Sequence, residues 1–338
     1  MTLTRVLLIA VLASPGVAAA QGSSTDALLK TTHFAFYSDL ATNVNDALVA
    51  AGGARVSKQP EPFASGPVKA CLDGLPAAER DAWMRGVDYF ATTTSTSFQR
   101  VMLRLELAGM VRGSDVSDAA IRKFLEEVTA IREAATPAYR ACRWAEQDGL
   151  NRRWIEGVKP LLDKYERDLG EQLPRLFQKP WQGLPFRVDV VQTAGFGGAN
   201  SASPLEPTLH ILVSSTNAGN QDRAALEVVF HEAVHFLTRS DSPLGMALAS
   251  ALKEAGGTPP RMDLVHGVHF FLTGEAVRRA YARAGEPEYS PYLYAQKLFP
   301  DQFREAAARI WPSYIDGART MAQAAGDLAR ALTTQAKE

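Results

Sequence analysis

Cysteine is scarce in this chain, and it contains no long apolar run and no block of like charges. Cys71 and Cys142 are the only cysteines among 338 residues, and their wide spacing argues against a cysteine-rich zinc motif or a CxxC redox site. Lysine and arginine total 36 against 37 aspartate and glutamate residues, a balance that disfavours nucleic acid and anionic membranes as partners. Apolar runs fall well short of the roughly 20 residues that span a bilayer, so we expect no transmembrane segment in the mature chain.

The first twenty residues have the pattern of a secretory signal peptide. Arg5 supplies a positive charge, "VLLIAVLA" supplies a short apolar segment, and three alanines ending at Ala20 supply a small-residue cleavage site. We expect cleavage near Ala20 and a periplasmic or secreted protein. Two cysteines commonly pair in such an oxidising compartment, so we predict a disulfide between Cys71 and Cys142.

Most of the chain has the periodicity of helices. Apolar residues recur three and four positions apart through most of residues 76–177, and the C-terminal part shows the same spacing. Alternating residues within 31–40 predict a strand. We therefore predict an α+β fold that is mainly helical, with a small sheet and an additional helical layer.

The predicted elements divide the chain into three regions. Residues 1–20 are the predicted signal peptide, and residues 21–180 contain one strand followed by mostly helical segments. Residues 181–338 begin with further strands and continue into helices. The alternative is that residues 21–338 form one compact domain.

Two further strands are predicted at residues 184–192 and 207–215, joined by a glycine-rich loop, "TAGFGGANSASP", over 193–204. We expect them to form a hairpin with a long connection. The loop lacks the lysine and the following helix of a phosphate-binding loop. In the second strand, apolar residues share one face while His210 and Leu212 share the other, a pattern compatible with a sheet edge.

The segment "LEVVFHEAVHFLT" contains the motif HExxH within a stretch of helical periodicity. His231 and His235 are one helical turn apart, so both imidazoles can reach one metal ion. Glu232 lies beside that face, where its carboxylate can accept a proton from a metal-bound water. The surrounding residues are uncharged, as expected for a helix packed against a core.

This segment resembles the zincin metallopeptidases, in which a strand precedes the helix that carries HExxH. The likeness covers residues 185–281, and its specific part is the five-residue motif. The resemblance implies a zincin-like core, zinc (Zn2+) bound by His231 and His235, and Glu232 as the catalytic base. Zinc also needs at least one more protein ligand and an open position for water.

Two branches of the family offer different third ligands. The gluzincin branch takes a glutamate from a later helix, and "HGVHFFLTGEAVRRAY" provides Glu275. The metzincin branch continues as HExxHxxGxxH or ends in aspartate, which corresponds to Asp241, but Thr238 replaces the glycine of the turn. A β-branched residue suits a turn with positive φ poorly, so we favour Glu275, with Asp241 and His266 as alternatives.

His266 and His269 lie in the same region as Glu275. Either could donate a hydrogen bond to the oxyanion that forms when hydroxide adds to a carbonyl, and we favour His266 in that catalytic role. An ordinary core or surface position is the alternative for each of them.

Together, these features predict an exported zinc-dependent hydrolase, most simply a metallopeptidase that acts on a peptide or protein substrate. One alternative is a catalytically inactive zincin-like protein of the cell envelope that binds zinc and acts by interaction. Another is a helical scaffold in which HExxH is fortuitous. Similarity of fold does not fix the substrate, so metal content and turnover have to separate these classes.

Overall fold

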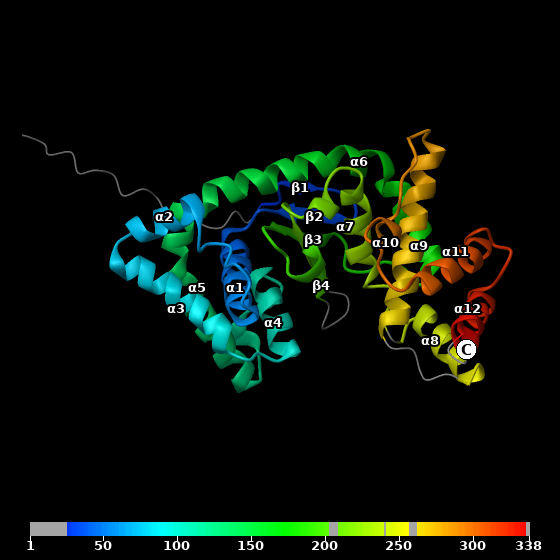
Figure 1. Ribbon diagram of the computed structural model, residues 1–338, viewed down its shortest axis with the longest axis horizontal. Coiled ribbons are helices and arrows are strands. Elements are labelled where there is room, and N and C mark those ends of the chain that lie inside the picture. Colours follow the sequence, from blue (N-terminus) through cyan, green and yellow to red (C-terminus); the bar gives the residue numbers. More distant parts are fainter. Residues whose placement is uncertain (1–25, 203–208, 240, 257–261, 336–338) are drawn as a thin grey trace, which may run out of the picture.

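The computed structural model describes residues 26–202, 209–239, 241–256 and 262–335. The predicted signal peptide, residues 1–20, lies outside them. Figure 1 shows helices α1 to α5 at one end of the molecule and α8 to α12 at the other, with the sheet between them. The long helix α6 runs across the top and joins the two ends (Figure 1).

The elements follow one another in an order that confirms a mainly helical α+β fold. Their bounds are β1 (Leu29–Lys30), β2 (Phe34–Tyr37), α1 (Leu40–Ser57), α2 (Gly66–Gly74), α3 (Ala77–Thr92), α4 (Ser97–Leu107), α5 (Ala119–Tyr139), α6 (Ala145–Phe177), β3 (Phe186–Val191), β4 (Ala199–Ala202), β5 (His210–Ser214), α7 (Ala224–Val234), α8 (Pro243–Glu254), α9 (Met262–Arg283), α10 (Tyr292–Ala295), α11 (Asp301–Ile315) and α12 (Met321–Gln335).

The strands form one mixed sheet with the order β1-β2-β3-β5-β4. Strands β2, β3 and β5 are parallel neighbours, as expected when helices separate strands along the chain. β1 pairs antiparallel with β2, and β4 pairs antiparallel with β5. β4 is therefore an edge strand, and β5 is its neighbour in the sheet.

The hairpin predicted from residues 184–192 and 207–215 is wrong. The strands in these segments, β3 and β5, are parallel, and Asp189 lies opposite Leu212. The loop between them contains β4, which begins after Gly198 and pairs antiparallel with β5. Gly198 has a φ of 76°, a backbone conformation that favours glycine. The edge strand is thus β4 and not β5. The sequence did not predict β4, because its polar and small residues show no alternation of apolar residues.

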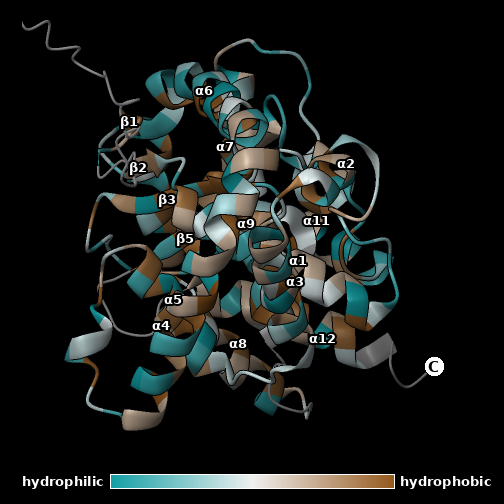
Figure 2. Ribbon diagram, turned by 90° about the vertical axis from the view of Figure 1, so that its left-hand side faces the viewer, coloured by the Kyte–Doolittle hydropathy of each residue, from teal (hydrophilic) through white to brown (hydrophobic). Residues whose placement is uncertain are grey.

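One face of the sheet forms the main hydrophobic core with α6, α7 and α9. Phe186 and Val188 of β3 and Ile211 of β5 are fully buried on this face. In Figure 2 the strands β3 and β5 are largely brown, whereas the helices around them show both brown and teal. This pattern fits strands that are buried on both faces and helices that bury one side.

The opposite face of the sheet is covered by α1 and α4 and is polar. Arg187 and Asp189 of β3 and His210 of β5 lie there. The placement of His210 away from the apolar face confirms the predicted alternation in this strand. The sheet therefore has a dry apolar side and a side with buried charges.

The helical end has its own smaller cores, and a disulfide connects two of its elements. Cys71 of α2 is bonded to Cys142 in the π-helical turn Arg140–Trp144, with the two Cα atoms 5.6 Å apart. The predicted disulfide is confirmed. The disulfide therefore links α2 covalently to the junction between α5 and the long helix α6.

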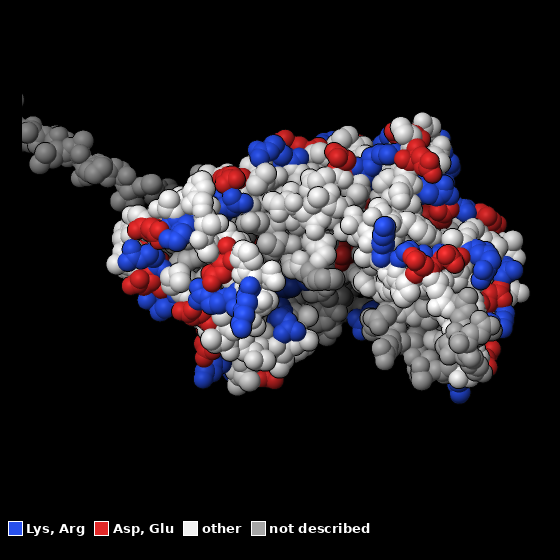
Figure 3. All heavy atoms as spheres, in the orientation of Figure 1, with Lys and Arg blue, Asp and Glu red and all other residues white. Residues whose placement is uncertain are grey.

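The visible surface has no dominant charge. Figure 3 shows lysine, arginine, aspartate and glutamate interspersed over this face of the molecule. Among the described residues, no helix is both long enough and apolar enough to cross a bilayer.

Candidate metal centre and its pocket

Helix α7 carries the HExxH motif through the centre of the molecule. It is buried on all sides from Ala225 to Val234, so its polar residues are held against the core instead of facing bulk solvent. The helix ends at Val234, one residue before His235, which keeps right-handed helical angles (φ −54°, ψ −27°). His231 and His235 therefore remain one turn apart, as the spacing predicts.

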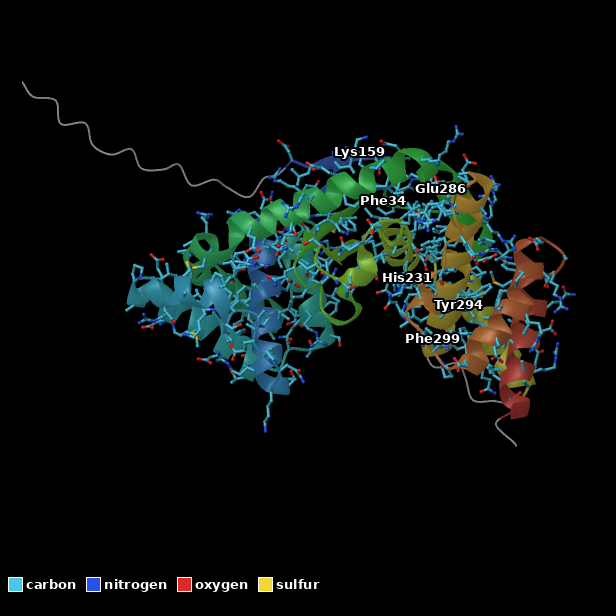
Figure 4. All side chains as sticks on the ribbon, turned by 45° about the horizontal axis from the view of Figure 1, so that its top comes forward. Phe34, Lys159, His231, Glu286, Tyr294 and Phe299 are labelled. Atoms are coloured by element: carbon cyan, nitrogen blue, oxygen red, sulfur yellow. A yellow bond between two sulfur atoms is a disulfide. The ribbon has the colours of Figure 1, made fainter. Side chains whose placement is uncertain are left out.

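Helix α9 brings two more histidines to the motif. His266 and His269 are three positions apart on one face of α9, and this face packs against α7. Candidate ligand atoms of His231, His235, His266 and His269 all lie within 4.8 Å of one another, so the cluster could hold a metal ion. Figure 4 shows His231 toward the middle of the molecule, on the side of α7 that faces α9.

Three of these imidazoles are spaced as ligands of a single ion. The ring centroids of His231 and His235 are 5.2 Å apart, and His266 lies 5.1 Å from the first and 5.0 Å from the second. Zinc–nitrogen bonds of about 2.0–2.1 Å in a tetrahedral site place imidazole centroids about 5.2 Å apart and nitrogens about 3.3 Å apart. The Nε2 atoms of His231 and His266 are 3.1 Å apart, close to this value.

His269 has a different environment from the other three. Its ring stacks on His231 with a centroid distance of 4.1 Å and an interplanar angle of 21°, an arrangement unlike that of two ligands radiating from one ion. Its Nε2 lies 2.8 Å from the backbone oxygen of His231, and its Nδ1 lies 3.2 Å from Oγ1 of Thr238. With both nitrogens bonded, His269 is suited to fixing the position of His231.

Desolvation favours the neutral form of His231, His235 and His269. Desolvation, reinforced by repulsion from the neighbouring imidazoles, lowers the pKa of His231 and His269 well below the usual value and that of His235 to about 3. Neutral imidazoles keep a lone pair for a metal ion. Nδ1 of His231 is buried and has no hydrogen-bond partner among the described residues.

Glu232 lies beside the cluster and is 5% exposed. Burial raises its pKa to about 7, while a hydrogen bond with Ser201 and the positive charge of Arg104 oppose that rise. Its Oε2 is 3.9 Å from Nε2 of His235 and has no hydrogen-bond partner among the described residues. A carboxyl group with a pKa near neutrality can both take and return a proton.

The cluster opens into a pocket of about 850 Å³. One wall is the edge strand β4, through Ala199 and Ser201, and the opposite side includes Phe270 of α9 and Phe299. Phe270 stacks on His231 with a centroid distance of 3.8 Å, which holds that ring in place. The volume lies in the range of small-molecule and peptide sites.

Glu275, the third ligand predicted from the sequence, is not brought to the cluster. It follows His266 by about two and a half turns of α9, which places it about 13 Å along the axis and on the opposite side of the helix. Its carboxylate accepts hydrogen bonds from Nε of Arg278 and Nε of Arg279, each at 2.7 Å. Burial would raise its pKa, but these two arginines lower it.

Helix α9 continues through Gly274, the residue before Glu275, without a break. A Cβ added at Gly274 would be 2.7 Å from Pro291 and 2.8 Å from Oε1 of Glu227. Glycine at this position allows the close packing of α9 and does not mark a helix end. The group of side chains that could hold one ion therefore includes His266 and does not include Glu275.

The metzincin-like alternative is not supported either. The side chain of Asp241 is 76% exposed, 3.6 Å from Arg239, and is absent from the histidine cluster. Thr238 bonds back to the oxygen of Val234 and contacts His269. Thr238 therefore helps to hold His269 in place, a different role from that of the glycine in a metzincin turn.

Several residues of the site could not be found from the sequence alone. Ser201 and Arg104 reach Glu232 from β4 and α4, and Glu227 lies in the pocket wall one turn before His231. Glu227 accepts hydrogen bonds from the hydroxyl of Tyr289 and the backbone nitrogen of Tyr292. The pair His266 and His269 did carry a signal, since two histidines three positions apart can share a helical face.

No protein-family model, no curated protein and no solved structure matches this chain. The function of the site has to be inferred from its geometry.

Proposed function

We propose that this protein is a zinc-dependent hydrolase of the zincin type, with His231, His235 and His266 as metal ligands. The observation that carries the proposal is the nearly equal spacing of the three imidazoles, 5.0 to 5.2 Å, beside a buried carboxyl group. Three imidazoles with one position left for water is a donor set typical of catalytic zinc.

Glu232 is the proton carrier in this proposal. Zinc, when bound, would lower the pKa of a coordinated water toward about 7 and polarise a carbonyl oxygen. Oε2 of Glu232, which is buried and has no partner among the described residues, would take the proton of the attacking water and later give it to the leaving amine. Ser201, through its hydrogen bond, holds the carboxyl group in place for both steps.

A peptide is the substrate that the pocket favours. The edge strand β4 borders the pocket through Ala199, Asn200 and Ser201. An edge strand can hold an extended peptide by backbone hydrogen bonds, which depend little on side chains. The aromatic wall opposite, Phe270 and Phe299, would contact apolar side chains of such a peptide.

The test is metal content and turnover of Glu232→Gln, using protein purified without a histidine tag. We expect one zinc per chain in both the parent and the variant, and a loss of peptide hydrolysis of more than about 100-fold in the variant, since the proton carrier is removed. Asp241→Asn is the matched control on the exposed segment after α7, and it should keep both zinc and activity.

Three results would contradict the proposal. They are a parent without stoichiometric zinc, a Glu232→Gln variant with full turnover, or a zinc-loaded parent that hydrolyses nothing in a broad fluorogenic peptide library. The last result would favour a zinc-binding protein without catalysis.

A further inference from the structure

A second pocket, of about 540 Å³, lies on the polar face of the sheet. Helices α1, α3 and α4 form one side and strands β4 and β5 form the other. It meets the first pocket at Asn200 and Ser201 of β4, which line both. The histidine cluster lies on the far side of the edge strand, so the second pocket has its own set of groups.

His210 presents an unused acceptor to this second pocket. Its side chain is fully buried, and its Nε2 is 2.7 Å from Oδ2 of Asp189. Arg187 also bonds Asp189, which keeps that carboxylate ionised and makes Nε2 of His210 the donor. Nδ1 is then an acceptor, and this buried atom has no partner among the described residues. His210 itself is one of the residues that line the pocket.

Arg104 presents an unused donor next to His210. Its terminal nitrogens donate to Asn200 and to the backbone oxygen of His210, but its Nε is buried without a partner among the described residues. Oδ1 of Asn45, on α1, is in the same condition and lines the same pocket. The hydroxyl oxygen of Tyr89, another lining residue, is a fourth such atom. Buried polar atoms without partners are uncommon, and four from the lining of one cavity indicate a polar occupant.

The rest of the pocket combines an apolar wall, several hydroxyl groups and two groups of opposite charge. Phe90, Phe124 and Leu212 form an apolar wall. Arg100 adds a positive charge at the rim, and Asp46 adds a carboxylate that Thr193 and Ala194 already bond. Water molecules could hydrogen-bond to the polar atoms, but the apolar side chains would then stay in unfavourable contact with water. A molecule with both polar ends and an apolar part fits the pocket better.

We propose that the second pocket binds a free α-amino acid with an apolar side chain. The carboxylate would accept from Nε of Arg104, and the ammonium group would donate to Nδ1 of His210 and Oδ1 of Asn45. The apolar side chain would lie against Phe90 and Phe124. A zwitterion has no net charge, which suits a pocket that contains both signs. This site does not depend on the zinc-dependent activity.

The first experiment is a thermal-shift screen of the twenty standard L-amino acids, each at up to about 10 mM, on protein with and without zinc. We expect an apolar amino acid to raise the melting temperature equally in both forms. For that amino acid, calorimetry should show at least about 10-fold weaker binding of its amide and of its deaminated analogue, because each lacks one charged end. Binding that requires zinc would assign the ligand to the histidine cluster and overturn the proposal, as would no binding by any of the twenty.

The second experiment fills the pocket at a position that tolerates change. Val49 of α1 lines the pocket and is 46% exposed, so Val49→Trp should fold and lower the affinity by at least about 10-fold. Val56→Trp is the matched control, since Val56 lies on the same helix, is 64% exposed and is outside the pocket lining. Equal affinity in the two variants would place the ligand elsewhere.

Discussion

The histidine cluster and the buried His210 lie on opposite sides of the edge strand and differ in their partners. On the α7 side, His231, His235 and His266 face one another, and Nε2 of His235 lies 3.9 Å from Oε2 of Glu232. On the α4 side, His210 donates to the ionised Asp189. Burial lowers the pKa of His210 to about 4, and the Asp189 carboxylate opposes that shift.

The comparison shows that burial alone does not define the role of a histidine. The imidazoles of the cluster converge, and desolvation favours the neutral form of His231 and His235, so their lone pairs can be satisfied together by a cation. His210 has one nitrogen fixed by a carboxylate, which determines its tautomer and leaves a single acceptor. The first arrangement is suited to a metal and the second to a hydrogen-bonding ligand.

The largest expected effect is loss of zinc from the cluster. His266→Phe should weaken zinc binding by more than about 100-fold, because it removes a proposed ligand while keeping the volume of the ring. His269→Phe should weaken it by about 10- to 100-fold, the usual cost of losing a group that orients a ligand. Competition with a chromophoric chelator, after circular dichroism has confirmed folding, measures both affinities.

Glu275→Gln is the control for this experiment, and it should bind zinc as the parent does, since the Glu275 carboxylate is held by Arg278 and Arg279. If His269→Phe loses more affinity than His266→Phe, the roles of these two histidines are reversed. If Glu275→Gln loses the metal, the ligand set proposed from the structure is wrong.

The next effect concerns stability on the other side of the sheet. His210→Phe should lower the free energy of unfolding by about 3 kcal/mol, because it leaves the buried Asp189 with Arg187 as its remaining charged partner. His210→Gln is the matched variant and should lose less, because its amide can still donate to Asp189. Urea denaturation of both variants measures the difference, and equal losses would show that the hydrogen bond to Asp189 contributes little.

The smallest expected effect is a pH dependence from Glu227, which lies in the wall of the first pocket. Burial raises its pKa from the usual 4.5 to about 7, although Tyr289 and Tyr292 oppose the shift. Between these two values the folded protein binds more protons than the unfolded chain, so the free energy of unfolding falls as pH rises. Glu227→Gln removes this contribution to the pH dependence of the free energy of unfolding. The stability of the variant relative to the parent should therefore increase from pH 4.5 to 7, by about 1–3 kcal/mol, and level off above pH 7.

Urea denaturation across this pH range tests the prediction, with the exposed Glu288→Gln as the control that should show no such trend. A constant difference between Glu227→Gln and the parent at every pH would mean that Glu227 is not perturbed in the folded protein.

The sequence by itself determined the features that depend on short spacing or on composition. The helical periodicity predicted the mainly helical class, and four positions between His231 and His235 placed both rings on one face, because the helical repeat is local. Two cysteines in the whole chain allowed one intramolecular pairing, and the structure contains it.

Tertiary structure alone decided which side chains join His231 and His235, where the sheet has its edge, and where the second pocket lies. His266 reaches the motif because α9 packs against α7, whereas Glu275 lies on the opposite side of the same helix, and a sequence pattern cannot show which face will be turned inward. Gly274 lies inside α9 at a close contact, where an added Cβ would meet Pro291 and Glu227 from distant segments. Arg104 is far from the motif in sequence and reaches the sheet only through the packing of α4. These outcomes depend on contacts between distant segments, and no local periodicity encodes them.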